Sequence, residues 1–158
     1  MSINRMKKYI SIIVFIAIGI CSGYSQTQKA FRKAADEAMV SKNYYGALTW
    51  YMEALDFDRD DPELIYKVAE SARLFKAYDL AAEKYKLIVD SLGQGNYPDA
   101  SLYLGQMYQQ LGKYEDAQNY YNIYVSENSG ENEELTQMAK DGLESVEYAL
   151  VKIEDMHF

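Results

Sequence analysis

The chain has 158 residues, of which 24 are acidic and 16 basic, so its formal net charge at neutral pH is −8. Hydrophobic residues make up 49% of the sequence and only two residues are proline, which is typical of a globular, mostly helical domain and excludes a disordered segment. No basic patch is present to neutralise phosphates, which argues against binding to nucleic acid and to anionic membrane surfaces. Tyrosine is abundant, with 16 residues; its ring can fill a core while its hydroxyl reaches a polar partner.

Residues 1–25 have the pattern of a secretory signal peptide. Three basic residues precede the apolar run YISIIVFIAIGI, and small polar residues follow it. The run is too short to predict a membrane span, and Gly23 and Ser25 fit the positions before a cut at Gln26. Cleavage removes three basic residues and no acidic ones, which leaves a charge of −11. We therefore expect an exported protein, periplasmic or associated with the outer membrane, with no membrane span in its mature form.

The only cysteine, Cys21, lies within this segment. An alternative to cleavage after Ser25 is lipoprotein-type processing, in which Cys21 would carry a lipid. Ile20 stands before it, where such sites usually have Gly or Ala, so the sequence favours cleavage. The mature domain would then contain no disulfide, and packing alone would hold it together.

The sequence repeats with a period of 34 to 36 residues, and large and small side chains keep their register. Each repeat divides into two helical blocks around a short break, which predicts three helical hairpins at about 28–61, 62–95 and 98–130. Small residues would let two helices approach, and tyrosines would fill the space beside the contact. The positions in register include Ala35, Ala69 and Gly105; Tyr44, Tyr78 and Tyr114; Ala47, Ala81 and Ala117; and Tyr51, Tyr85 and Tyr121.

The pattern LGxxYxxxGxYxxAxxxYxxYV in the third repeat resembles the tetratricopeptide repeat (TPR). The resemblance covers residues 28 to 130 and implies an all-α, right-handed superhelix of three hairpins. Lys42 and Lys76 stand where the pattern has a turn glycine. We expect an amphipathic helix at 131–152 to cap the last hairpin, and residues 153–158 to form a tail.

No catalytic set is evident in the sequence. After removal of the signal peptide the chain has one histidine, His157, no cysteine and no glycine-rich phosphate loop. The stretch DFDRDDPE places Asp56, Asp58 and Asp60 at calcium-loop spacings, but the required turn glycine is Asp61. Because a proline follows, Asp61 is better interpreted as a helix cap. We therefore expect no enzyme activity, no bound metal and no cofactor, and we assign the tyrosines to packing.

The TPR resemblance implies that function lies in a concave groove formed by the first helices of the hairpins. The first-helix residues outside the packing positions are amphipathic as a group and would suit an extended or helical peptide segment. Recognition of a C-terminal carboxylate is disfavoured because Asp36 replaces the asparagine of such clamps. The groove candidates are Arg32, Asp36, Met39, Tyr66, Glu70, Arg73, Leu102, Gln106 and Gln109.

A signal peptide, three tyrosine-rich repeats and the helix MAKDGLESVEYALV together look like the N-terminal module of exported Bacteroidetes proteins. Those proteins continue into a β-propeller and an OmpA-like peptidoglycan-binding domain, and some are associated with type IX secretion and gliding. The resemblance implies a non-catalytic scaffold that binds a segment of another envelope protein. The alternatives are a truncated module of a larger peptidoglycan-anchored protein, and a structural spacer that associates with itself.

Overall fold

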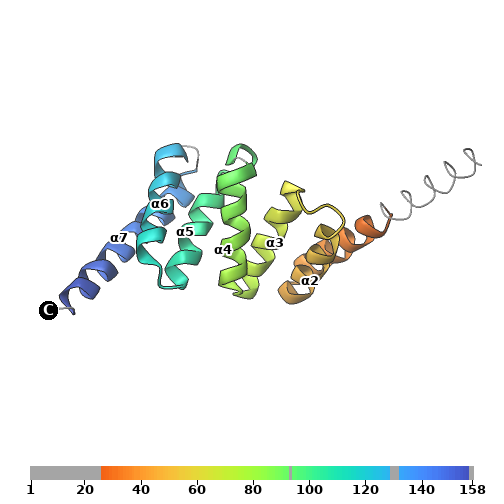
Figure 1. Cartoon of the computed structure of the whole chain (residues 1–158), viewed down its shortest axis with the longest axis horizontal. Helices are drawn as coiled ribbons and strands as arrows, with labels where there is room; N and C mark the ends of the chain where they lie inside the picture. The colour runs from red at the N-terminus through yellow and green to blue at the C-terminus, as the bar shows by residue number, and fades with distance from the viewer. Residues whose placement is uncertain (1–25, 93, 129–131, 157–158) are drawn as a thin grey trace, which may run out of the picture. The chain divides into compact units, whose positions relative to one another are not determined.

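The structure is a computed structural model that describes residues 26–92, 94–128 and 132–156. Within these ranges the regular elements are helices, and none of the residues belongs to a strand (Figure 1). The predicted signal peptide with Cys21, and His157, lie outside the described residues. The chain divides into two compact units, one ending at Arg59 and one starting at Asp60, and we describe each by itself.

The described residues of unit 1, 26–59, form a single helical hairpin. Its first helix covers residues 26–40 and its second is α2 (Tyr44–Leu55). Asn43 caps α2, because its side-chain oxygen accepts a hydrogen bond of 3.0 Å from the backbone N–H of Gly46. Ala35 and Ala47, two of the small residues in register, have no exposed surface.

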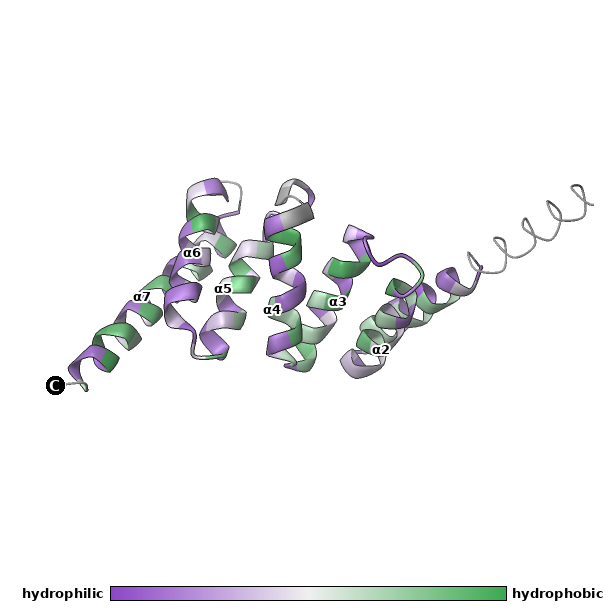
Figure 2. Ribbon diagram, in the orientation of Figure 1, coloured by the Kyte–Doolittle hydropathy of each residue, from purple (hydrophilic) through white to green (hydrophobic). Residues whose placement is uncertain are grey.

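Unit 2 consists of two stacked hairpins and one further helix (Figure 1). α3 pairs with α4 and α5 pairs with α6, while α4 also packs on α5 and α6 on α7. Figure 2 shows that these helices carry both hydrophobic and hydrophilic residues, as expected where one side of a helix packs and the other meets water. The elements are α3 (Pro62–Phe75), α4 (Tyr78–Leu87), a π-helical turn (Ile88–Leu92), a 3-10 turn (Gln94–Asn96), α5 (Ala100–Gln110), α6 (Tyr114–Asn128) and α7 (Glu133–Asp155).

The first and last helices of unit 2, α3 and α7, each begin at a side-chain cap. A side-chain oxygen of Asp61 accepts hydrogen bonds from the backbone N–H groups of Glu63 and Leu64, at 3.0 and 3.2 Å, and Pro62 opens α3. The interpretation of Asp61 as a helix cap is therefore confirmed. The capping helix expected at 131–152 is observed at Glu133–Asp155, so it takes in residues that were expected to belong to the tail.

The turn inside each hairpin places one residue in the left-handed backbone conformation. The two lysines that replace the turn glycine adopt positive φ angles, as does the glycine of the third repeat. In each turn the next N–H donates to a carbonyl five residues earlier, which is the hydrogen bond of a Schellman motif. The residues are Lys42 (φ 58°), Lys76 (φ 67°) and Gly112 (φ 71°).

The core of unit 2 shows why small and large residues alternate. Tyr121 is buried, and its ring lies between two glycines, one on α5 and one on α7. A methyl group on Gly105 would lie 2.8 Å from Cδ1 of Tyr121, and one on Gly142 would lie 2.6 Å from its Cζ. Neither distance is compatible with a carbon contact, so the ring needs both glycines. The prediction that small residues make room for the tyrosines is confirmed at this site.

Candidate functional site

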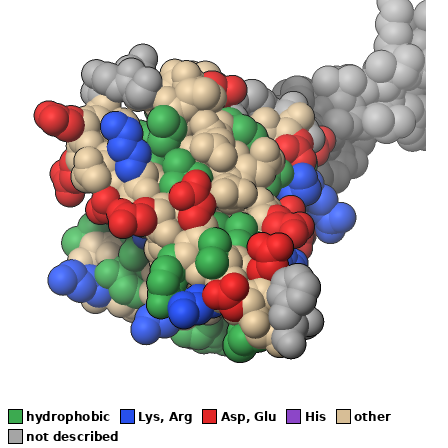
Figure 3. Space-filling view, turned by 90° about the vertical axis from the view of Figure 1, so that its left-hand side faces the viewer, with side chains coloured by type: hydrophobic (Ala, Val, Ile, Leu, Met, Phe, Trp, Pro, Cys, Tyr) green, Lys and Arg blue, Asp and Glu red, His purple; other side chains and the backbone are tan. Residues whose placement is uncertain are grey.

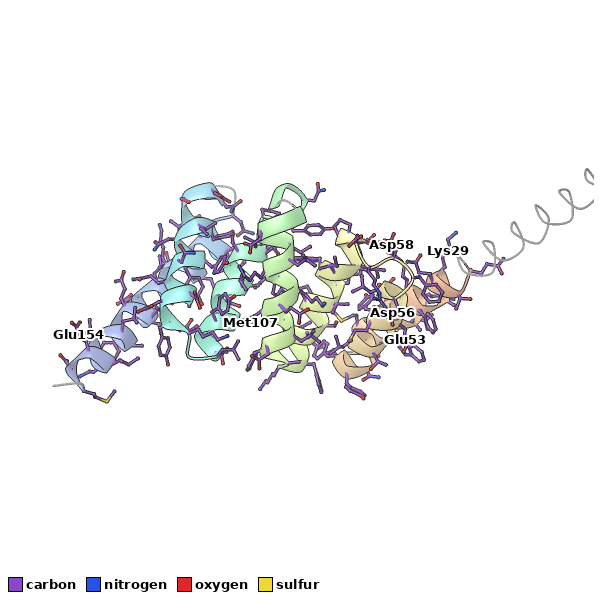
Figure 4. All side chains as sticks on the ribbon, viewed as in Figure 1. Lys29, Glu53, Asp56, Asp58, Met107 and Glu154 are labelled. Atoms are coloured by element: carbon purple, nitrogen blue, oxygen red, sulfur yellow. The ribbon has the colours of Figure 1, made fainter. Side chains whose placement is uncertain are left out.

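A hollow of about 600 Å³ lies in unit 2 between α3, α5 and α7. Most of its lining is uncharged, and buried Met107, labelled in Figure 4, belongs to it. Glutamine amides from α5 face a thioether and a hydroxyl from α7, and one arginine comes from α3. The lining residues used below are Arg73, Gln106, Gln109, Gln110, Met138 and Ser145.

In each hairpin the register tyrosine of the second helix donates its hydroxyl to a polar residue on the first helix. Tyr51 donates to Asp36 at 2.5 Å, Tyr85 donates to Glu70, and Tyr121 donates to Gln109 at 2.6 Å. All three acceptors are predicted groove residues. The rings of these tyrosines stay buried while their hydroxyls reach polar partners. Hydrogen bonds from the core therefore hold the side chains of the three groove candidates in place.

On α3, Arg73 is held by three groups. Its Nη2 lies 2.7 Å from a carboxylate oxygen of Glu70, and its Nε donates to the hydroxyl of Tyr85 at 3.2 Å. Its guanidinium carbon lies 4.2 Å from the centroid of the Tyr103 ring, which adds a cation–π contact. Burial, together with the charge of Glu70, raises the pKa of Tyr85 well above its ordinary value, so this phenol stays protonated and can donate.

Tyr66 is also part of a packed cluster. Its ring stacks on Tyr97 with a centroid separation of 4.6 Å, and its hydroxyl donates to Asp99 at 2.8 Å. Burial, and then the charges of Glu70 and Asp99, raise the pKa of Tyr66 above its ordinary value. Tyr66 therefore ties α3 to the segment that leads into α5, and Arg73 ties α3 to α4 and to α5 itself, in addition to any contact with a guest.

On α5, the two predicted glutamines reach across to α7. Nε2 of Gln109 donates to the hydroxyl of Ser145 at 3.0 Å, and Nε2 of Gln106 lies 2.9 Å from the sulfur of Met138. Burial raises the pKa of Tyr121 to about 12, so its phenol remains the donor to Gln109 up to strongly alkaline pH. These amides form one wall of the hollow.

One predicted groove residue faces the core instead. Leu102 has no exposed surface and packs in the cluster that contains Tyr124 and Val146. The repeat register placed it beside Gln106, but an apolar side chain at this point of α5 is buried by the neighbouring helices. We therefore leave Leu102 out of the candidate surface.

The other three candidates belong to unit 1. Arg32 and Met39 are half-buried, and Asp36 is exposed, all on the helix of residues 26–40. The sequence reasoning missed Met138 and Ser145, because it treated the last helix only as a cap. The available signal was the seven-residue spacing of these two residues, which places them on the same side of α7.

The described part of the chain has neither a cluster of metal-ligating side chains nor a membrane-spanning helix. In residues 26–92, 94–128 and 132–156, no group of three or more His, Cys, Asp or Glu side chains is placed to hold a metal ion. In the same ranges, no helix is long and apolar enough to cross a membrane.

No protein-family model matches the chain, and no curated protein matches it either. Solved structures do. The first TPR of Spaghetti (RPAP3) bound to an HSP90 peptide is 22% identical, with a TM-score of 0.66 over 80% of this chain and 95% of that one. SycD, a type III secretion chaperone of Yersinia enterocolitica in complex with a peptide of the translocator YopD, is 18% identical, with a TM-score of 0.64 over 78% and 95%.

The Sgt2 TPR domain from Aspergillus fumigatus is 21% identical, with a TM-score of 0.62 over 81% of this chain and 82% of that one. At these identities the similarity establishes the fold. The all-α TPR fold predicted from the repeat register is therefore confirmed.

Proposed function

We propose that the protein is a non-catalytic scaffold that holds a peptide segment of a partner protein in the hollow between α3, α5 and α7. The observation that carries the proposal is the amide wall formed by Gln106, Gln109 and Gln110 opposite Met138 and Ser145. An amide can donate and accept hydrogen bonds, so it can pair with the backbone of an extended segment. A methionine adapts its shape to an apolar side chain.

Peptide complexes of the same fold support this proposal. The Spaghetti TPR was solved with an HSP90 peptide and SycD with a YopD peptide. In this chain, Arg73 is already paired with Glu70, and the other two charged residues of the lining, Lys76 and Asp141, have opposite signs, which favours an internal, largely uncharged segment over a C-terminal carboxylate as the guest.

We further propose that the partner is a protein of the cell envelope. Support comes from the predicted signal peptide and from the resemblance to the N-terminal module of exported Bacteroidetes proteins of the OmpA-like, peptidoglycan-binding type. The proposal includes a periplasmic or outer-membrane-associated location and a role beside type IX secretion or gliding components.

The test compares three forms of the protein as bait for an envelope fraction. Gln106→Ala with Gln110→Ala removes two amides from the hollow, whereas Gln118→Ala with Asn119→Ala removes two amides from α6, outside its lining. Tyr66 and Arg73 are unsuitable because they hold α3 in place. We expect the first variant to bind the partner at least about tenfold more weakly, which corresponds to a loss of about 1.4 kcal/mol, and to capture correspondingly less of it when the partner is scarce. The α6 variant should capture as much as the unmodified protein, and an identical yield from all three would exclude the hollow.

A second candidate function is self-association through α7. Tyr148, Val151 and Met156 are exposed apolar residues near the end of this helix. Figure 3 shows hydrophobic side chains among acidic ones on the corresponding end of the molecule. An exposed apolar surface of this kind can pair with a second copy. Its test is the solution mass over a hundredfold range of concentration, and a monomer throughout would reject it.

A further inference from the structure

Unit 1 contains a second hollow, of about 750 Å³, between the first turns of the 26–40 helix and the end of α2. Two phenylalanine rings and three carboxylates line it, together with Thr27 and Gln28. In Figure 4 the labelled side chains of Glu53, Asp56 and Asp58 lie at the same end of this hairpin as Lys29. The ring and acid positions are Phe31, Phe57, Glu53, Asp56 and Asp58.

The rings form a continuous aromatic wall that solvent can reach. Phe31 stacks on Trp50 with centroids 5.7 Å apart and an interplanar angle of 17°, and it lies 5.9 Å from Phe57. Trp50 remains 40% exposed and Phe57 37% exposed, so the wall is not part of a closed core. The faces of aromatic rings carry negative potential and attract cations.

The charged side chains that line this hollow all have the same sign. Glu53, Asp56 and Asp58 contribute three carboxylates, and no basic residue is in the lining. Among these carboxylates, Asp56 forms an ion pair with Arg59 across 3.3 Å. The Arg59 side chain is 81% exposed, and a pair this exposed is weak, so a guest can replace it at little cost.

Unit 2 already contains the combination of groups that this hollow offers. There the guanidinium of Arg73 lies 4.2 Å from the Tyr103 ring centroid and 2.7 Å from a Glu70 oxygen. A planar guanidinium can stack on a ring and at the same time direct its N–H groups at a carboxylate, which an ammonium group does less well. The hollow of unit 1 supplies the ring and the carboxylates without the arginine.

We propose that the unit 1 hollow is a second binding site, which takes an arginine side chain from a basic segment of a partner protein. This site is independent of the amide-lined hollow in unit 2, and it selects its guest by charge, whereas the unit 2 hollow offers mainly uncharged hydrogen-bonding groups.

Trp50 provides a local readout, because it is the only tryptophan and it stacks on Phe31. The purified protein is titrated with the blocked peptide Gly-Arg-Gly-Arg-Gly and with a version in which citrulline, the neutral isostere, replaces each arginine. We expect saturable fluorescence change with the arginine peptide, at least about tenfold weaker binding of the citrulline peptide, and weaker binding at high salt. No saturable change, or equal binding of both peptides, would overturn the proposal.

Two double variants separate this site from general attraction to an acidic protein. Glu53→Gln with Asp58→Asn keeps the side-chain shapes and should weaken binding of the arginine peptide by about tenfold. Glu133→Gln with Glu134→Gln removes the same charge from a smaller acidic hollow on α7 that has no aromatic lining, and should leave binding within about twofold. Equal weakening in both variants would show only long-range attraction and would refute a specific site. Circular dichroism of both variants is the check that they are folded.

Discussion

The second hairpin, α3 with α4, and the third, α5 with α6, follow the same repeat register, but the hydroxyl of the buried register tyrosine has a different kind of partner in each. In both, the register tyrosine is buried and its hydroxyl bonds to the first helix. In the second hairpin that hydroxyl meets the charged pair of Glu70 and Arg73. In the third it meets the neutral amide of Gln109.

This difference decides which hairpin has hydrogen-bonding groups to offer. Arg73 is held by a carboxylate and a phenol of its own hairpin and by the Tyr103 ring on α5, so its charge is already paired. Gln109 accepts a hydrogen bond from Tyr121 and donates one to Ser145 of α7. Gln106 and Gln110 lie beside it on the same helix. The register thus specifies where a ring is buried, while the residue that meets its hydroxyl specifies the chemistry of the surface.

The largest expected effect concerns the glycines around Tyr121. The double variant Gly105→Ala with Gly142→Ala places a methyl group within 3 Å of the ring on each side, so the ring cannot shift away from both. We expect the free energy of unfolding to fall by about 3 kcal/mol, because overpacking outweighs the gain in helix propensity. Urea denaturation followed by circular dichroism measures it.

A smaller side chain at Tyr121 tests the cause of this loss. In a Tyr121→Leu background the two added methyl groups have space, so the same glycine substitutions should cost less than about 1 kcal/mol. Additive losses in the triple variant would mean that the glycines are needed for another reason.

The next effect compares the two hydroxyls. Tyr85→Phe removes a hydrogen bond to a charged group and should cost about 2 kcal/mol, whereas Tyr121→Phe removes a neutral one and should cost about 1 kcal/mol. Both changes keep the ring, so packing is constant. Thermal unfolding of the two variants beside the unmodified protein gives the difference, and equal losses would show that the charge of Glu70 adds nothing.

The sequence predicted the repeat, the hairpins and the buried tyrosines, because periodicity reports which residues face a neighbouring helix. It also identified Lys42 and Lys76 as substitutes for the turn glycine. It could not place Leu102 correctly, since register alone does not say how the next helix covers a position. Nor could it find the contribution of α7 to the hollow, because that helix lies outside the repeat and its neighbours are set by tertiary packing.

The sequence pattern also does not predict the aromatic and acidic hollow of unit 1. The calcium-loop spacing of Asp56, Asp58 and Asp60 gives no sign of the aromatic rings, because spacing along the chain reveals sets of ligands but not which ring faces lie beside them. Phe31 is more than twenty residues away from Asp56, and only the folding of the hairpin brings the ring beside the carboxylates.

The smallest expected effect concerns the turns of the two hairpins. Lys76 holds a left-handed φ of 67° that costs a residue with a Cβ about 1 kcal/mol, whereas Gly112 adopts 71° without that cost. Lys76→Gly should therefore raise the free energy of unfolding by about 1 kcal/mol, and Gly112→Ala should lower it by a similar amount. Lys76→Ala serves as the control, because it removes the charge and most of the side chain but keeps the Cβ. If Lys76→Ala stabilised the protein as much as Lys76→Gly, the gain would come from losing the lysine side chain, and the two turns would not differ in backbone strain.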